Sequence, residues 1–424
     1  MRRTLCSDLT HAEPGSPVRL RGWVHRRREL AKITFLVVRD RSGLAQVVLP
    51  AGTEVPPEET TIEVEGTATA SPQAPGGIEV IQAQVTALGE PADTPVVELW
   101  RPTLDASLPV LLDHAATTWR HPGQRAKWQL AAASLRGFRA TLDAQDFTEV
   151  HTPKLVESAT ESGADVFTVD YFGRPAFLAQ SPQFYKQQLV GVFERVYEVG
   201  PVFRAEPHDT VRHLAEYVSL DVELGFIDDH HEVIGCLRDT VAGMVEGLRE
   251  HAGAAVERLG ITLPDVPAEL PTLHFREAVE IVGAPAYEPD LSPAHERALG
   301  AWARETHGCD FLVVEGYPTA HRAFYTHSDP DEPRWSRSFD LIFRGIELVS
   351  GAQRLHRHDD YLRVLTERGY PLAPYASYVE AFRRGIPPHG GFAIGLERWV
   401  GRLVEAPNIR EVTLFPRDLH RLAP

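Results

Sequence analysis

The stretch of residues 195–226 constrains the fold of this chain most strongly, because it predicts two β-strands joined by a charged loop. In its second half, apolar residues from Val218 to Phe226 alternate with polar residues, and a strand places these two sets on opposite faces. A hairpin that turns its polar face to solvent is common. Rows of charge with both signs also suit a ligand of mixed charge, so both interpretations stay open at this point. The charged rows hold Glu198, Arg204 and Glu206 in the first strand, and Asp221 and Glu223 in the second.

The bulk composition is that of a globular protein with two or three domains. The chain has 424 residues, of which 43% are hydrophobic and 24% charged. It lacks the run of about 18 apolar residues that a membrane span needs, and its first residues lack the apolar core of a secretion signal. Cys6, Cys236 and Cys309 stand far apart, without metal-ligand spacing or a disulfide pattern. We therefore expect a soluble cytoplasmic protein.

The charge composition makes lysine informative in this chain. A net charge of −16 argues weakly against a nucleic-acid partner, although local clusters count for more than the total. Almost all basic residues are arginines, so a lysine inside a motif stands out. The only lysines are Lys32, Lys127, Lys154 and Lys186.

The N-terminal part predicts a small β-domain. Residues 18–88 contain five short alternating segments separated by turn residues, and five short strands in this length favour a closed barrel of the OB type. Residues 91–124 are rich in proline and have no clear period, which indicates a linker or hinge. We therefore expect an OB-fold domain in residues 1–90, this linker, and a second domain in residues 125–424.

The predicted barrel carries the densest basic cluster of the chain. Trp23 and Phe35 lie on adjacent predicted strands beside this cluster. Single-stranded nucleic acid is bound by such a combination of phosphate-attracting charge and base-stacking rings. A solvated charged face is the plainer alternative, but the barrel context favours nucleic acid. The cluster comprises Arg26, Arg27, Arg28, Lys32, Arg39 and Arg41.

The second domain begins with a predicted amphipathic helix at residues 125–145, followed by a broken strand at residues 147–157. Further along, Pro182 is well placed to begin a helix, which would put Gln183 and Lys186 on one face of its first turns. A helix lysine is usually exposed. The rarity of lysine here, and the position of Lys186 between polar strands, favour a ligand-binding role.

A second informative hairpin is predicted around the turn Arg344–Gly345. Its strands would bring Asp340, Glu347 and Ser350 together. Two carboxylates and a hydroxyl can hold Mg²⁺, which prefers oxygen ligands and shares phosphate oxygens with nucleotides. Arg354 follows the second strand, where its guanidinium could bind a carboxylate through two N–H groups.

The C-terminal region predicts a glycine-rich strand that runs into a helix. Gly390 and Gly391 permit close approach of the backbone to a ligand, and Arg398 lies in the first turn of the helix, where the helix dipole favours phosphate. The acidic and histidine residues at 228–232 could suggest a metal. Because consecutive residues at a helix start diverge, a solvated helix N-terminus is the better explanation there.

In this order, the segments resemble the class II aminoacyl-tRNA synthetases, and specifically the aspartyl-tRNA synthetases of archaeal type. Residues 147–153 are similar to motif 1, whose proline lies at the dimer interface, residues 203–226 to motif 2, and residues 390–404 to motif 3. The runs QSPQFYKQ and SGAQR are similar to the aspartate-specific signatures. The resemblance covers essentially the whole chain. It implies an α+β fold, with an N-terminal OB-fold β-barrel followed by a class II catalytic domain whose antiparallel sheet is flanked by helices.

The resemblance also implies a role for individual residues. Arg204 and Arg398 would be catalytic, because they would neutralise the phosphates of ATP while Mg²⁺ acts as cofactor. Glu161 would lie on a loop that closes over the amino acid. The implied ATP-binding residues are Arg204, Glu206, Arg212, His213, Leu214, Glu347, Gly395 and Arg398. The implied aspartate-binding residues are Glu161, Gln183, Lys186, Arg204, Asp221, Ser350 and Arg354. The implied metal ligands are Glu347 and Ser350, with Asp340 as a further candidate.

The implied activity is ATP-dependent ligation of L-aspartate to tRNA through aspartyl-adenylate. The asparaginyl enzyme shares this architecture, but asparagine would leave Lys186 and Arg354 poorly paired. An asparagine synthetase on the same catalytic fold would lack the barrel. A non-catalytic OB-fold RNA-binding protein with a degenerate second domain would not be expected to keep Arg204, Glu347 and Arg398.

The choice of tRNA is the finest inference from the resemblance. In archaeal-type members, a histidine after Gly-Trp and a proline before Gly-Gly accompany relaxed reading of the third anticodon base, and this chain has His25 and Pro75 at those places. We therefore hypothesise a non-discriminating enzyme that charges tRNA-Asp and tRNA-Asn, with a tRNA-Asp-specific enzyme as the alternative. A homodimer and a tRNA-dependent amidotransferase are the further partners considered. The implied anticodon contacts are Trp23, His25, Arg26, Phe35 and Pro75.

Overall fold

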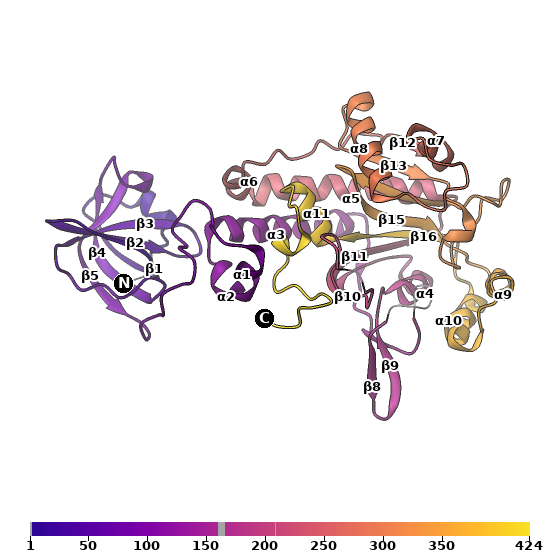
Figure 1. The fold of residues 1–424 in the computed structure, drawn as a ribbon, viewed down its shortest axis with the longest axis horizontal. Coiled ribbons are helices and arrows are strands. Elements are labelled where there is room, and N and C mark those ends of the chain that lie inside the picture. Colours follow the sequence, from indigo (N-terminus) through magenta and orange to yellow (C-terminus); the bar gives the residue numbers. More distant parts are fainter. Residues whose placement is uncertain (1, 160–165, 208) are drawn as a thin grey trace. The chain divides into compact units, whose positions relative to one another are not determined.

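The structure, a computed structural model, describes residues 2–159, 166–207 and 209–424. The chain divides into two compact units, Met1–Pro122 and Gly123–Pro424, and Figure 1 shows the elements of each unit. Within the described residues, no helix is both long and apolar enough to cross a membrane.

The first unit contains a closed five-stranded barrel, which confirms the predicted OB-type architecture. The strands follow the order β1-β2-β3-β5-β4. In β3, Ala45, Val47 and Leu49 are buried while the residues between them are not, so period-two alternation fills the barrel with apolar side chains. The strands are β1 (Pro17–Glu29), β2 (Ile33–Arg39), β3 (Leu44–Pro50), β4 (Thr61–Ala70) and β5 (Ile78–Ala87).

The region predicted as an irregular linker is partly helical. It contains α1 (Leu108–Asp113) and α2 (Ala115–Thr118), and the hydroxyl of Thr118 donates to the carbonyl of Leu111 across the two helices. Helices of four to six residues are too short to leave a period in the sequence, which explains why no clear period is visible here. The role of this region as a linker or hinge stays a prediction.

The second unit is built on an eight-stranded sheet in the order β12-β13-β14-β15-β16-β11-β10-β6. Its six central strands are antiparallel, as predicted, whereas β12 pairs with β13, and β6 with β10, in parallel. The turn at Arg344–Gly345 is confirmed, and both residues have positive φ, as a tight hairpin turn requires. The strands are β6 (Thr148–Glu149), β10 (Arg195–Phe203), β11 (Glu216–Gly225), β12 (Thr272–His274), β13 (Phe311–Glu315), β14 (Ser338–Phe343), β15 (Ile346–Gln353) and β16 (His389–Gly395).

Helices flank this sheet, and two long ones, α3 (Pro122–Asp143) and α5 (His230–His251), share one hydrophobic core with its apolar face. Asp229 caps α5 by accepting a hydrogen bond from the backbone N–H of His231, as expected for a helix N-terminus. The expected divergence and full solvation of these side chains were wrong, because His230 is buried and pairs with Glu315 at 2.9 Å, and one ligand atom each of Asp229, His230 and His231 lies within 4.8 Å of the others. The other helices are α4 (Gln183–Phe193), α6 (Gly253–Leu259), α7 (Phe275–Ile281), α8 (Pro293–His307), α9 (His358–Glu367), α10 (Ala376–Ala381) and α11 (Leu396–Leu403).

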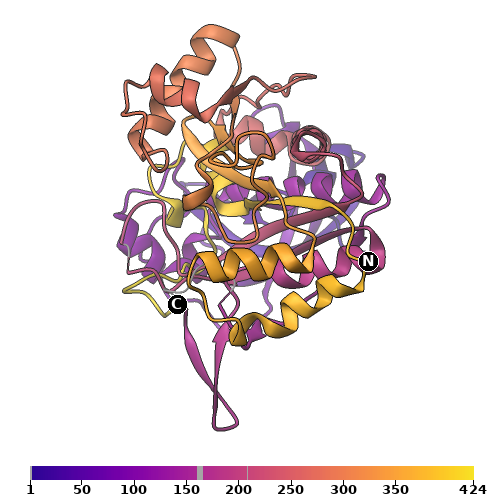
Figure 2. The same ribbon diagram turned by 90° about the vertical axis from the view of Figure 1, so that its right-hand side faces the viewer.

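A second aromatic core and a small sheet complete this unit. Phe184 of α4 stacks on Tyr378 of α10 within a cluster that also includes residues of α9. A three-stranded sheet of β7 (Leu155–Val156), β9 (Arg174–Leu178) and β8 (Thr168–Tyr171) lies apart from the main sheet. Figure 2 shows its β8–β9 hairpin projecting from the body of the unit.

Close packing of α3 on α5 depends on glycine. A Cβ atom added at Gly137 would lie 2.1 Å from the carbonyl oxygen of Gly243 and would meet the backbone there. We expect Gly137→Ala to lower the free energy of unfolding by about 1–3 kcal/mol, because the clash is with backbone that cannot rotate away. Urea unfolding followed by fluorescence would measure this.

Gly235 is a matched control within α5, because a Cβ there would meet nothing within 4 Å. Gly235→Ala should raise stability by about 0.5–1 kcal/mol through helix propensity. Equal effects of the two substitutions would contradict the close helix contact.

Candidate active site

One lateral row of residues crosses the polar face of the main sheet. Asp221 of β11 pairs with Ala393 of β16, Ala393 with Ser350 of β15, and Ser350 with Asp340 of β14. Directly paired residues project from the same face, and neighbouring strands lie about 4.8 Å apart. Predicted amino-acid and metal ligands that are far apart in the sequence therefore lie on one line across the sheet.

Small residues on β16 keep this face open. Gly391, Ala393 and Gly395 alternate with Phe392 and Ile394, which are both buried in the core on the opposite face. A Cβ at Gly391 would lie 2.1 Å from a carboxylate oxygen of the neighbouring β11 strand. Ala393 and Gly395 of this strand line the cavity described below, whereas Gly390 and Gly391 lie against other protein atoms. Close approach of the backbone to a ligand at Gly390 and Gly391 stays a prediction.

A β-bulge places Glu347 and Ser350 on the same side of the sheet. In a regular strand, residues three apart point to opposite faces. In β15, however, Val349 pairs with Leu341 while Glu347 pairs with Ile342, so Leu348 is an extra residue. This bulge shifts the alternation by one position, and both predicted metal ligands then line the same cavity.

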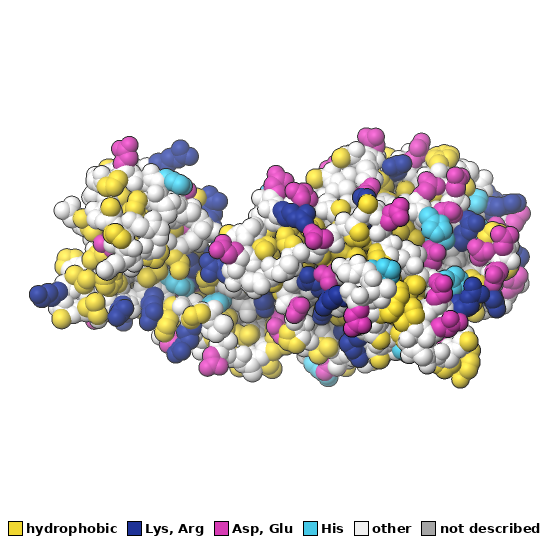
Figure 3. All heavy atoms as spheres, turned by 90° about the horizontal axis from the view of Figure 1, so that it is seen from above, with side chains coloured by type: hydrophobic (Ala, Val, Ile, Leu, Met, Phe, Trp, Pro, Cys, Tyr) yellow, Lys and Arg dark blue, Asp and Glu magenta, His cyan; other side chains and the backbone are white. Residues whose placement is uncertain are grey.

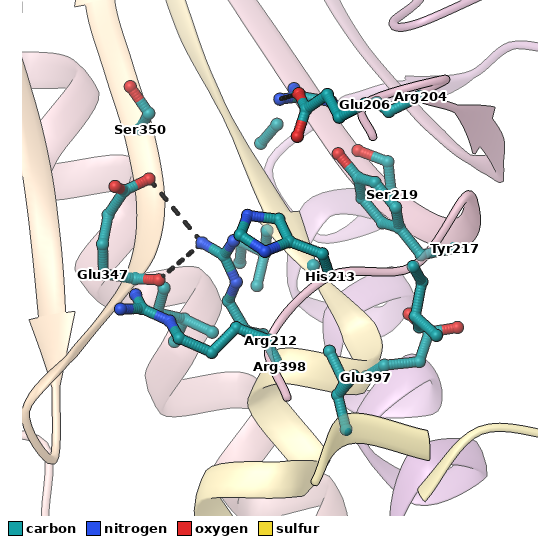
Figure 4. A pocket seen from close by; sticks show the side chains of 16 residues that line it. Arg204, Glu206, Arg212, His213, Tyr217, Ser219, Glu347, Ser350, Glu397 and Arg398 are labelled. Atoms are coloured by element: carbon teal, nitrogen blue, oxygen red, sulfur yellow. Dashed lines mark hydrogen bonds and ion pairs between the residues drawn. The ribbon is translucent and has the colours of Figure 1, made fainter. Parts of the chain in front are cut away.

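A cavity of roughly 170 Å³ lies on this face (Figure 4). All eight residues predicted to bind ATP line it, together with Ser350. The cavity also has Tyr217, Ser219 and Glu397 in its wall, for which the sequence assigned no role although Tyr217 and Ser219 share a strand face with Asp221. The eight residues are Arg204, Glu206, Arg212, His213, Leu214, Glu347, Gly395 and Arg398.

Each arginine of the cavity is held by a carboxylate or a carbonyl group. Arg398 donates to the backbone oxygen of Glu347 at 2.8 Å, as the dashed lines of Figure 4 mark, and Arg212 pairs with Glu296 at 2.7 Å. Arg204 lies 3.6 Å from Glu206. Glu296 of α8, which sequence reasoning missed, also accepts the backbone N–H of Glu347 at 2.7 Å. It gave no signal, because it lies in a helix far from every motif.

The predicted metal ligands form an acidic pair whose charges are not fully compensated. Burial raises the pKa of Glu347 to about 7, and the negative charge of Asp340 adds to the shift. One oxygen of Asp340 pairs with Arg322 at 2.6 Å, while the other is buried and has no hydrogen-bond partner among the described residues. Carboxylates that repel each other beside a cavity fit a divalent cation with hard oxygen ligands. The donor set therefore suits Mg²⁺.

Beside the cavity lies a buried ionic network built on Lys186. Its ammonium group is 3.1 Å from Asp221 and 3.3 Å from Glu223, and it donates to two backbone carbonyls as well. Arg354 pairs with Glu223 at 3.3 Å and donates to the carbonyl of Gly391 at 3.0 Å. The structure thus brings three predicted aspartate ligands together. It adds Glu223, which the alternation on β11 placed on the right face without assigning it a role.

Behind this network, buried polar side chains hold one another in fixed orientations. His389 donates through Nδ1 to the carbonyl of Pro387 at 2.8 Å, so its Nε2 accepts from the amide of Gln187 at 3.0 Å. Burial lowers the pKa of His389 to about 4, which keeps the ring neutral. Gln183 is buried as well, and its amide nitrogen has no partner among the described residues. That donor suits a bound polar ligand.

The predicted anticodon residues all belong to the barrel, but not all reach its surface. Arg26 is exposed and stacks on Trp100 at 3.7 Å, Pro75 is exposed, and Trp23 and Phe35 are half-buried. His25 is the extra residue of a β-bulge in β1 and is buried, with its ring 3.1 Å from a nitrogen of Arg39. Contact of the His25 ring with an anticodon base is therefore not available in this conformation.

The predicted basic cluster needs a correction as well. Arg39 is buried in a two-pronged ion pair with Glu59, at 2.7 Å for both contacts. Its charge is neutralised inside the barrel, because a cation cannot be buried without a partner. The exposed part of the cluster is therefore Arg26, Arg27, Arg28, Lys32 and Arg41. The predicted aspartate ligand Glu161 lies outside the described residues.

Comparison with known proteins identifies the fold and its family. Residues 108–419 match the family described as tRNA synthetases class II (D, K and N), and residues 18–88 match the OB-fold nucleic acid binding domain. The chain belongs to the class II tRNA synthetase family.

Individual relatives narrow this assignment to the aspartate–tRNA ligases, as the motifs predicted. The chain is 45% identical to the aspartate–tRNA(Asp/Asn) ligase of Thermus thermophilus, with 100% of both chains covered. It is 44% identical to the protein of the same name from Deinococcus radiodurans, over 100% of this chain and 99% of the relative. It also resembles the crystal structure of asparaginyl-tRNA synthetase from Pyrococcus horikoshii complexed with asparaginyl-adenylate, with a TM-score of 0.92, 30% identity and 100% of both chains covered.

Glu397 gives this synthetase a defined dependence of stability on pH. Its carboxylate accepts the backbone N–H of Val218 at 3.2 and 3.1 Å, and burial raises its pKa from 4.5 to about 7. The folded chain therefore binds more protons than the unfolded chain between those pH values. It follows that the contribution of Glu397 to stability is lost as pH rises from about 4.5 to 7, by roughly 3 kcal/mol in all.

We expect Glu397→Gln to remove this loss, so that the variant gains stability over the parent chain between pH 5 and pH 8 by up to roughly 3 kcal/mol. Urea titrations of both proteins at the two pH values measure the difference. Glu305→Gln, an exposed residue of α8, is the control and should show no such gain. A pH-independent difference between Glu397→Gln and the parent chain would refute the assignment.

Proposed function

We propose that this chain ligates L-aspartate to tRNA in two steps, with aspartyl-adenylate as the intermediate. The observation that carries the proposal is the position of two different sites on one sheet face. An arginine-lined cavity lies beside a buried ionic network of Lys186, Arg354 and their carboxylate partners. The cavity suits a polyphosphate, and the network suits a small ligand that carries charges of both signs. The names of the relatives from Thermus thermophilus and Deinococcus radiodurans support the same substrates.

In the first step, the α-carboxylate of aspartate attacks the α-phosphorus of ATP. The bond from that phosphorus to the bridging oxygen breaks, and pyrophosphate leaves with the electron pair. The carboxylate is already a nucleophile, so no protein base is required. Arg204 neutralises the α-phosphate, Arg398 holds the γ-phosphate, and Glu206 with the backbone of residues 212–214 holds adenine. Guanidinium groups fixed before the reaction stabilise the developing charge without reorganisation.

Glu347 and Ser350 would hold Mg²⁺, with Asp340 beside them. When bound, this ion supplies positive charge to the phosphate oxygens. The raised pKa of Glu347 agrees with this role. Ionisation of this carboxylate costs free energy when no cation is near, and a bound cation stabilises the ionised form.

The buried network around Lys186 and Arg354 selects the amino acid in this proposal. Arg354 and the charge of Lys186 bind the side-chain carboxylate of aspartate, while Asp221 and Gln183 receive the α-amino group. Asparagine would offer an amide in place of the anion, and a buried cation that loses a charged partner is costly. The asparaginyl alternative is supported by structural likeness to solved asparaginyl-tRNA synthetases such as the Pyrococcus horikoshii enzyme, at lower identity than the aspartate–tRNA ligases.

In the second step, the terminal ribose hydroxyl of tRNA attacks the adenylate. We propose that the barrel reads the anticodon and accepts both tRNA-Asp and tRNA-Asn. Since His25 is buried, its influence passes through Arg39, whose guanidinium lies 5.6 Å from the ring of Trp23. The exposed Arg26 and Pro75 remain available for direct contact.

The assembly and its setting are further parts of this proposal. We propose a cytoplasmic homodimer with Pro153 at the interface, and an amidotransferase as partner for aspartyl-tRNA-Asn. The division into an anticodon-binding domain (1–90), a hinge (91–124) and a catalytic domain (125–424) is proposed on the same basis.

Aspartate-dependent exchange of labelled pyrophosphate into ATP tests the first step. We expect L-aspartate to exceed L-asparagine by at least about 100-fold in kcat/KM. Arg398→Gln should lower the exchange rate by about 100-fold or more while the melting temperature stays unchanged, because Arg398 acts on charge that develops in the reaction. Arg384→Gln, an exposed arginine outside the cavity, is the control. Exchange driven by asparagine alone would overturn the assignment.

Charging of two transcripts that differ only at the third anticodon base tests tRNA choice. A non-discriminating enzyme should aspartylate both transcripts with kcat/KM values within about tenfold of each other. Discrimination above about tenfold at one base requires direct contact of the protein with that base. Trp23→Ala should weaken charging of both transcripts and leave aspartate-dependent exchange intact. A preference above about 100-fold for the tRNA-Asp transcript would establish the discriminating alternative.

A further inference from the structure

A second cavity, of roughly 280 Å³, adjoins the first one. The two cavities share Arg212, Glu397, Arg398 and Ile409 in their walls. The second one continues between α11, the start of α8 and the β14–β15 turn. Nothing in the reaction described above uses this space. Its other charged lining residues are Arg297, Arg344, Arg402 and Glu405.

This second cavity is strongly basic in a chain of net charge −16. Five arginines line it against two glutamates, Glu397 and Glu405. Elsewhere the charges are mixed, and on the face in Figure 3 basic and acidic side chains of the second unit are interspersed. A cavity that concentrates one sign of charge focuses the electrostatic field on an oppositely charged ligand.

The arginines differ in whether the protein neutralises them. Arg212 pairs with Glu296, and Arg344 pairs with Asp310 at 2.9 Å. By contrast, neither Arg297 nor Arg402 makes an ion pair with any described carboxylate, and the buried Nε of Arg402 has no hydrogen-bond partner there. Arg297 is exposed, so its donors can be satisfied by solvent. Buried polar groups in folded proteins are normally satisfied, so the unused donor of Arg402 indicates an anion that is bound during the reaction.

The geometry of α11 connects the two cavities. Arg398 and Arg402 are four residues apart on this helix, so their side chains project from the same face, one turn apart. Arg297 follows Glu296, the carboxylate that holds Arg212, and its Cα lies 3.2 Å from the position of a Cβ on Gly345. Arg402 therefore lies one helical turn beyond Arg398, and both Arg297 and Arg402 line the cavity that continues from the first one.

We propose that this arginine-lined cavity binds inorganic pyrophosphate as it leaves the nucleotide site. The inference rests on the proposed aspartate activation, which breaks the bond from the α-phosphorus to the bridging oxygen and releases pyrophosphate with that oxygen and its electron pair. Pyrophosphate carries more negative charge than either the β- or the γ-phosphate alone carried within ATP. Arg297 and Arg402 provide positive charge for it. The cavity thus draws the product away from the adenylate. It also sets the affinity for pyrophosphate in the reverse reaction.

Pyrophosphorolysis of the enzyme-bound aspartyl-adenylate tests the proposal, with Arg297→Gln and Arg402→Gln compared with the parent enzyme. We expect each substitution to raise the KM for pyrophosphate by about tenfold, the effect of losing one charge-assisted hydrogen bond to phosphate, while the KM for ATP in adenylate formation changes by less than about twofold. Arg258→Gln, an exposed arginine of α6 with no described ion pair and outside both cavities, should change neither value.

Equal changes in both KM values, or no change in the KM for pyrophosphate, would overturn the proposal. Because Arg402 is half-buried, Arg297→Gln alone decides the matter if Arg402→Gln proves unstable. Calorimetric titration with magnesium pyrophosphate should show binding that both variants weaken. If the parent enzyme catalyses no aspartate-dependent exchange but still binds pyrophosphate through these arginines, the proposed function fails and the anion site stands. Inhibition of charging by excess ATP that both variants relieve would identify the tail of a second nucleotide as the ligand instead.

Discussion

The ammonium group of Lys186 is buried, with 2% of its side chain exposed, and lies between two carboxylates of the same strand. Asp221 and Glu223 point to one face of β11, where their mutual repulsion would oppose burial without a cation. Loss of one partner from such a network costs about 3–5 kcal/mol. The interaction also joins α4 to the centre of the sheet, and so fixes where the ionic network lies relative to the cavity.

The opposite face of β11 explains why the charges of Lys186, Asp221 and Glu223 can lie so close to the hydrophobic core. Leu220, Val222 and Leu224 pack with α3 and α5, which anchors β11 by hydrophobic burial on that side alone. On the polar side, the glycines and alanine of β16 leave room for carboxylates and for a ligand. One face of the sheet therefore packs in the core and the other face lines the site, because alternate residues of each strand point to opposite faces.

The alternation of apolar and polar residues along the strands could be recognised in the sequence. It predicted the barrel strands, the polar row on β11 and the hairpin around Arg344–Gly345, and the resemblance to known motifs supplied eight residues that line the first cavity. Alternation alone does not reveal where one extra residue shifts it. At Leu348 such a shift brings Glu347 to the face of Ser350, as the predicted metal ligands required, and at His25 it turns the side chain inward. A bulge depends on pairing with a distant strand and leaves no local pattern. Glu296 and Glu223 were missed as functional residues for a related reason, since their partners are set by tertiary contacts.

Glu296 then links parts of the site that the motifs describe separately. Its carboxylate accepts from Arg212 in the motif 2 loop and from the backbone of Glu347 on β15, and its charge contributes to the raised pKa of Glu347, which the nearby Arg398 opposes. In the proposed reaction, a phosphate that draws Arg212 away would leave the charge of Glu296 less neutralised, and this would strengthen the negative field at Glu347. Such a field attracts a divalent cation. On the proposed function, polyphosphate and metal would therefore favour each other's binding through one carboxylate, that of Glu296.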